Sequence, residues 1–140
     1  MKSESSTYTG FEFEVDGYPA MAIINTDLKN MDDRFDYDCS VFVSIIPDAV
    51  NENGHPTEPE YEYLNEVEKE MIAYLENQTA TVHVGHTTVF RGREIIFYTK
   101  DKVMVEIFLE NFLPGIEREF SFELEQDPEW GNVEGFYELI

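Results

Sequence analysis

Segments with strand-like and helix-like patterns follow one another along this chain, and their order restricts the fold more than any other sequence feature. Residues 41–46 form an apolar run, and residues 81–89 and 94–100 are rich in β-branched and aromatic side chains. Residues 120–125 alternate between apolar and polar side chains. Each of these patterns is typical of a β-strand.

Two other segments show helical spacing. The first follows a Thr-x-x-Glu capping box at Thr57 and should turn one apolar stripe toward the core. The second should begin after Asp101 and end before Pro114 and Gly115. The apolar stripe of the first helix consists of Leu64, Val67, Met71 and Leu75, and the glutamates expected on its solvent side are Glu66, Glu68 and Glu70.

The complete order of strand, helix, strand, strand, helix, strand predicts an α+β fold. It is the order of the ferredoxin-like βαββαβ sandwich, in which both helices lie on one face of an antiparallel sheet. Residues 11–15 alternate before a turn at Asp16 and Gly17, which adds an N-terminal β-hairpin. The tail 127–140 is too apolar to be free and should pack back on the domain. The length predicts a single domain over residues 1–140.

Charge is the most unusual quantity in the composition. Thirty Asp and Glu residues against nine Lys and Arg residues give a formal net charge of -21. Nucleic acids are held mainly by Lys and Arg, so this charge argues against direct binding of nucleic acids and of anionic membranes. The acidity serves solubility, docking to a basic protein partner or adaptation to a saline host, and the sequence leaves these alternatives open.

Cysteine content and hydropathy indicate the compartment. Cys39 is the only cysteine, which excludes an intrachain disulfide, and the N-terminal residues lack the apolar stretch of a signal peptide. No apolar run approaches the ~18 residues that a membrane-spanning helix needs. We therefore expect a cytoplasmic protein.

Histidine and aspartate provide the candidate metal ligands. His83 and His86 are three positions apart, so in a regular strand they point to opposite faces and bind one ion only if the strand bulges between them. The Asp-rich segment 27–38 lacks the residue order of an EF-hand loop and is interpreted as a solvated acidic loop. Cys39 follows Asp38, whose charge should raise the pKa of the thiol. We expect no metal site, no cofactor and no catalytic residues.

A family resemblance extends over most of the chain. The run from Val84 to Tyr98 resembles the bacterial domain-of-unknown-function family numbered 695, and the segments 16–20, 64–68 and 127–130 are similar to other blocks of that family. In that family a basic residue such as Arg often stands where this chain has His86, which argues against an anion-binding role there. The resemblance implies kinship with the ferredoxin-like regulator that inhibits ribonuclease E, the ribonuclease E inhibitor B type, and hence protein binding rather than catalysis.

Three hypotheses about function follow. The first is a non-enzymatic protein-binding or regulatory module, including a nuclease regulator, whose carboxylates meet a basic protein partner. A toxin-immunity protein fits the same size and acidity. A small-ligand-binding or catalytic domain with a site near the second hairpin is the third. The residues proposed for these roles are Asp32, Asp33, Asp36 and Asp38 in the acidic loop, and Arg93, Glu94, Tyr98 and Trp130 around the hairpin.

Each hairpin residue also has a purely structural interpretation. Tyr98 and Trp130 supply large apolar area and would then be packed in the core. Arg93 and Glu94 would form an exposed or cross-strand ion pair. A sheet face left uncovered would favour a homodimer.

Overall fold

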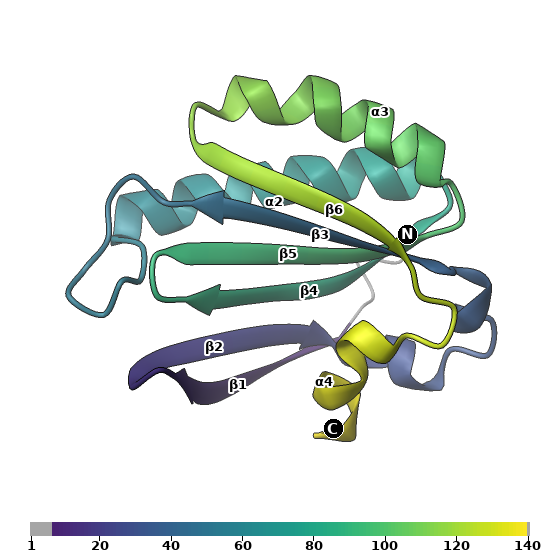
Figure 1. Cartoon of the computed structure of the whole chain (residues 1–140), viewed down its shortest axis with the longest axis horizontal. Coiled ribbons are helices and arrows are strands. Elements are labelled where there is room, and N and C mark those ends of the chain that lie inside the picture. The colour runs from purple at the N-terminus through teal and green to yellow at the C-terminus, as the bar shows by residue number, and fades with distance from the viewer. Residues whose placement is uncertain (1–6, 140) are drawn as a thin grey trace.

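The computed structural model describes residues 7–139, and within them six strands and three α-helices form an α+β domain (Figure 1). Every neighbouring pair of strands is antiparallel. The strands are β1 (Tyr8–Val15), β2 (Tyr18–Asn25), β3 (Cys39–Ile46), β4 (Thr81–Val89), β5 (Gly92–Thr99) and β6 (Glu119–Gln126). The helices are α2 (Glu58–Gln78), α3 (Lys102–Phe112) and α4 (Glu134–Glu138), with 3-10 turns at Thr26–Asn30, Arg34–Asp36, Leu113–Ile116 and Gly131–Val133.

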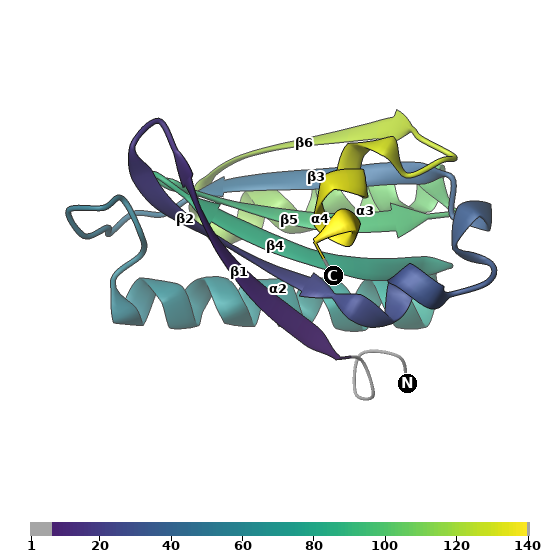
Figure 2. The same ribbon diagram turned by 90° about the horizontal axis from the view of Figure 1, so that it is seen from below.

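The strands lie in the order β1-β2-β4-β5-β3-β6, so the N-terminal hairpin extends the sheet beside β4. Its turn is at Asp16 and Gly17, as predicted, and both residues have the positive φ that a two-residue turn needs. β2 pairs with β4 only from Met21 to Ile24. The tip of the hairpin therefore reaches beyond this pairing, and Figure 2 shows β1 crossing the other strands at an angle.

Apolar side chains cover both faces of the sheet. On one face, Leu64 and Met71 of α2 and Leu109 of α3 pack against alternate residues of β3 and β5. On the other face, Tyr98 of β5 packs against Trp130, which lies just before α4. Figure 2 shows α4 in front of the strands and α3 behind them. The α+β class is confirmed, and α4 is an addition to the two predicted helices.

The two predicted helices begin close to their predicted starts, but not with the predicted caps. The Thr57 side chain makes no capping hydrogen bond, and Glu60 instead binds the guanidinium of Arg118 at 2.7 and 2.8 Å. Asp101 does not cap α3 with its side chain, because its carboxylate accepts a hydrogen bond from the amide of Ala80 at 2.6 Å. Contacts between distant segments therefore replace both local caps.

The C-terminal tail packs back on the sheet, as its apolar residues predict. Trp130 is 2% exposed, and its indole N–H donates to the carbonyl of Tyr37 at 2.9 Å. The Trp130 ring stacks on Tyr98 with 4.0 Å between the ring centroids. Core packing therefore accounts for both aromatic residues. In the described part of the chain, no helix has the length and apolar character that crossing a lipid bilayer requires.

The Asp127 carboxylate connects Tyr98 of β5 to the turn before α4, and its replacement gives a first prediction. The carboxylate accepts hydrogen bonds from the Tyr98 hydroxyl at 2.6 Å and from the amides of Gly131 and Asn132. Asp127→Ala should lower the free energy of unfolding by about 1–3 kcal/mol, because the buried hydroxyl loses its acceptor. Urea unfolding followed by Trp130 fluorescence measures this loss. Asp127→Asn, which keeps an acceptor, should lose less, and equal losses in the two variants would contradict the assignment.

Candidate functional site

A β-bulge in β4 determines the position of the candidate site. The register between β4 and β5 shifts between His83 and Gly85, and the φ of Gly85 is 149°, a conformation that only glycine adopts readily. A Cβ at this position would overlap the carbonyl oxygen of Ile23. Because of the bulge, His83 and His86 both face α2. Opposite faces are expected only for a regular strand, and the bulge between the two histidines is the exception to that expectation.

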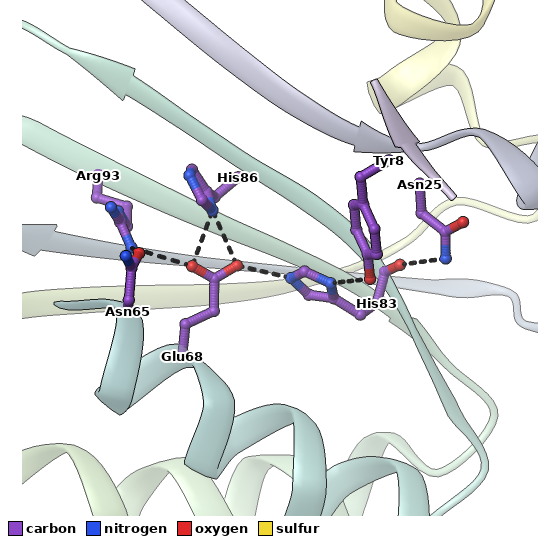
Figure 3. Close-up of polar contacts among 7 residues, drawn as sticks. All are labelled: Tyr8, Asn25, Asn65, Glu68, His83, His86 and Arg93. Carbon is purple, nitrogen blue, oxygen red and sulfur yellow. Dashed lines mark hydrogen bonds and ion pairs between the residues drawn. The ribbon is translucent and has the colours of Figure 1, made fainter. Parts of the chain in front are cut away.

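The carboxylate of Glu68, on α2, lies between the two imidazoles (Figure 3). It is 2.7 Å from Nε2 of His83, and its two oxygens are 2.8 and 3.0 Å from Nδ1 of His86. Glu68 is 5% exposed. Burial acts to raise its pKa, but hydrogen bonds from His83 and His86 hold the pKa of Glu68 well below its ordinary value. Glu68 is therefore an ionised carboxylate at neutral pH.

The expectation that Glu68 faces solvent together with Glu66 and Glu70 is wrong. Glu68 follows Leu64 by four positions and precedes Met71 by three, so it belongs to the buried stripe of the helix. The helical spacing alone therefore predicts that Glu68 is buried.

The carboxylate fixes the proton position on each imidazole, because an ionised carboxylate only accepts hydrogen bonds. The ring nitrogens that face it, Nε2 of His83 and Nδ1 of His86, therefore carry a proton. The other nitrogen of His83, Nδ1, lies 2.8 Å from the Tyr8 hydroxyl, and in the neutral imidazole it accepts a hydrogen bond from this hydroxyl. The other nitrogen of His86, Nε2, has no hydrogen-bond partner within residues 7–139.

Arg93, on β5, completes the cluster. Its Nη1 donates to Glu68 at 3.2 Å and to Oδ1 of Asn65 at 2.9 Å, and its guanidinium lies 5.2 Å from the centre of the Tyr61 ring. Arg93 is 1% exposed. Burial lowers the pKa of Arg93, the Glu68 carboxylate opposes this shift, and the guanidinium stays charged at neutral pH. Glu68 and Arg93 therefore form a buried ion pair.

A surface pocket of about 480 Å³ lies beside the cluster. Glu68, His83 and His86 form its polar inner side. Its lining also includes the apolar residues Ile23 and Ile72, and the polar residues Tyr8, Glu62, Asn65, Glu66 and Lys69. The pocket thus combines apolar surface with a few convergent polar groups, a combination typical of small-molecule sites.

The cluster is not arranged as a metal site. Residues 7–139 contain no group of three or more His, Cys, Asp and Glu side chains that could hold a metal ion. Glu68 contacts both imidazoles directly, which leaves no space for an ion between them, and Arg93 lies against the same carboxylate. A cation between these groups would meet the positive charge of the guanidinium.

The predicted residues of the second hairpin do not form one site. Arg93 is buried against α2, whereas Glu94 lies on the opposite face of β5, 3.4 Å from the Ser44 hydroxyl. Burial raises the pKa of Glu94. The two residues do not form the exposed or cross-strand ion pair expected from the sequence, because the nearest carboxylate to Arg93 comes from a helix.

The acidic loop between β2 and β3 presents three of its four candidate carboxylates to solvent. Asp32, Asp33 and Asp36 are exposed, while Asp38 is half-buried. The carboxylate of Asp38 accepts a hydrogen bond from the Gln126 side chain, and its backbone carbonyl accepts one from the amide of Asp127. The next residue, Cys39, is a buried free thiol. Burial is the main cause that raises the pKa of this thiol, and the Asp38 charge adds to it.

The fold and the site together define an α+β domain with a buried carboxylate–imidazole–guanidinium cluster beside a surface pocket. A family model described as "Family of unknown function (DUF695)" matches residues 8–136. The chain therefore belongs to this family, and the resemblance noted in the sequence is confirmed. No curated protein and no solved structure gives a significant match.

The lowered pKa of Glu68 predicts how stability depends on pH. Because the folded-state pKa lies below the unfolded value of about 4.3, the ionised form stabilises the fold above that pH, and this contribution is lost as the pH falls below it. Urea unfolding between about pH 5 and pH 3 should show a steeper loss of stability in the wild type than in Glu68→Gln. Equal slopes would contradict the assignment. The exposed-site variant Glu70→Gln, on the same helix, should keep the wild-type slope.

Proposed function

We propose that this chain is a small-ligand-binding domain whose site is the pocket beside Glu68, His83 and His86. The observation that carries the proposal is Nε2 of His86. The residue is 8% exposed, Glu68 orients its ring, it lines the pocket, and this nitrogen has no hydrogen-bond partner in the described chain. A bound ligand would take the place of solvent at this nitrogen.

The energetics of the cluster support a functional role. A buried ion pair is weak evidence for stability, because apolar residues of similar volume are often equally stabilising. Arg93 additionally leaves Nε and Nη2 without hydrogen-bond partners in the described chain. Perturbed ionisable groups that line a pocket are typical of binding and catalytic sites.

Binding is favoured over nucleophilic catalysis. The described residues that line the pocket include no serine, threonine or cysteine. The Tyr8 hydroxyl is committed to His83, and burial, with Glu76 and Glu68 adding to it, raises the pKa of Tyr8 well above its ordinary value. A phenol in this state is a poor nucleophile.

A fragment screen by protein-observed NMR tests the proposal. Small molecules of mixed charge should shift the amide resonances of β4 and of the first half of α2, and the shifts should weaken in His86→Asn. Asn retains an N–H for Glu68 near the position of Nδ1 and lacks an equivalent of Nε2. Glu70→Gln, which changes an exposed residue of the same helix, should respond as the wild type does. A screen in which no fragment shifts these resonances would overturn the proposal.

We further propose that the core of this domain is ferredoxin-like. The order β4-β5-β3-β6, with α2 after β3 and α3 after β5, supports this assignment, and the N-terminal hairpin and α4 would be additions. Kinship with the ribonuclease E inhibitor B type rests on the sequence resemblance. A reducing, cytoplasmic location is supported by the single buried free thiol of Cys39.

A second candidate function is a regulatory module that docks to a basic protein partner. The specific observation that favours it is the exposure of Asp32, Asp33 and Asp36 in a chain with a formal net charge of -21. Electrostatic docking weakens steeply with salt. A pull-down from host lysate should therefore lose the partner at high salt, and also in the variant with all three residues changed to Asn. Binding that is insensitive to salt would contradict this candidate.

A further inference from the structure

We infer that the pocket beside Glu68 takes a small primary amine in its ammonium form, rather than a neutral or an anionic ligand. The inference rests on the proposed function and specifies the ligand class of the same site. Three properties of the pocket carry it: the charge of its rim, the hydrogen-bonding character of its inner side and its apolar lining.

The rim of the pocket carries more negative than positive charge. Glu62 and Glu66 are exposed on α2, and Lys69 contacts Glu66 at 3.8 Å. Deeper in the cluster, the charge of Glu68 is balanced by Arg93. The whole chain has a formal net charge of -21. This distribution concentrates cations near the pocket and opposes the entry of anions.

The inner side of the pocket offers hydrogen-bond acceptors. His86 lines the pocket, and in its neutral form, with the Nδ1 proton toward Glu68, Nε2 carries a lone pair. The phenol oxygen of Tyr8 is a second acceptor when the neutral His83 ring takes the hydroxyl proton in their 2.8 Å hydrogen bond. An ammonium group donates three hydrogen bonds and a hydroxyl donates one, whereas a carboxylate donates none. The acceptors therefore match an ammonium best.

The apolar lining favours an organic amine over a bare cation. Ile23 and Ile72 contribute hydrocarbon surface to the pocket. Hard metal cations bind several oxygen ligands and gain nothing from such surface. A short hydrocarbon chain that carries the ammonium group would cover the two isoleucines and remove apolar area from water.

A series of four-carbon ligands isolates the head group at nearly constant size. n-Butylamine, 1-butanol and butyrate are titrated into the protein at neutral pH while amide and imidazole resonances are followed by NMR. Butylamine should shift the resonances of His86 and bind roughly tenfold more tightly than butanol, because it makes a hydrogen bond from a charged donor. Butyrate should not bind in the pocket.

Three variants test the residues that are responsible. His86→Asn should weaken butylamine binding roughly tenfold, because the acceptor Nε2 is lost. Glu62→Gln combined with Glu66→Gln should weaken it roughly threefold, as expected for exposed carboxylates. Glu70→Gln, also on α2 but outside the pocket lining, should bind as the wild type does. If His86→Asn does not fold, the double glutamine variant carries the test.

The possible results distinguish a failure of the amine assignment from a failure of the ligand-site proposal. Butanol or butyrate binding in the pocket as tightly as butylamine would overturn the amine assignment and leave the ligand site standing. If fragments of other chemistry bind there and butylamine does not, the amine assignment also fails alone. If neither the series nor the fragment screen shifts the pocket resonances, both proposals fail.

Discussion

Glu68→Gln is expected to lower the free energy of unfolding by about 3–5 kcal/mol. The change removes the negative charge that balances Arg93, and Arg93 is 1% exposed. The guanidinium would then be buried without a counter-charge, which is far more costly than the loss of a surface ion pair. Urea unfolding at neutral pH, followed by circular dichroism, measures the difference.

A second charge deletion distinguishes an uncompensated charge from a simple packing defect. Glu68→Gln combined with Arg93→Met removes both charges and should recover much of the stability lost in the single variant. Glu66→Gln, an exposed site on the same helix, should change stability by less than about 0.5 kcal/mol. A double variant no more stable than Glu68→Gln would show that the unbalanced Arg93 charge is not the cause.

Gly85→Ala should destabilise the protein by roughly 2–4 kcal/mol, from backbone strain together with steric overlap. The φ of Gly85 is 149°, and a Cβ would overlap the Ile23 carbonyl oxygen on β2. Relief of this overlap requires β4 to lose the bulge, which would turn His86 or His83 away from Glu68. Thermal unfolding measures the stability, and the imidazole resonances report the position of the rings.

A glycine without these restraints provides the control. Gly10 of β1 has no positive φ, and a Cβ there would meet its nearest neighbour, the Ala22 carbonyl oxygen, at 3.9 Å. Gly10→Ala should therefore have little effect. A Gly85→Ala variant with wild-type stability and unchanged histidine resonances would show that the bulge does not depend on glycine.

Most of the architecture could be predicted from the sequence because it follows from local periodicity. The turn at Asp16 and Gly17, the long helix and the succession of strands along the chain all have short-range signals. The helix caps at Thr57 and Asp101 could not be predicted with the same success. Glu60 of the predicted capping box and Asp101 instead bind Arg118 and Ala80, which lie far away in the chain.

The candidate site was harder to predict because it depends on two local departures from regular patterns. Gly85 inside a strand pattern is a recognised sign of a bulge, yet alternation alone assigns His83 and His86 to opposite faces. Glu68 has the helical spacing of a core residue and the chemistry of a surface residue. Its spacing signals burial, but the groups that stabilise its charge lie on β4 and β5, far away in the sequence.

The most direct test of the central claim is a long-range ¹H–¹⁵N NMR spectrum of the imidazoles, recorded with and without n-butylamine. The chain has three histidines, and His55 serves as an internal reference because its Nε2 contacts the Pro19 carbonyl at 2.7 Å. The structure predicts a proton on Nδ1 of His86, and the amine proposal predicts that butylamine shifts the Nε2 signal of His86 while His55 stays unchanged. A proton on Nε2 and none on Nδ1, or an Nε2 signal unaffected by any ligand, would contradict the account.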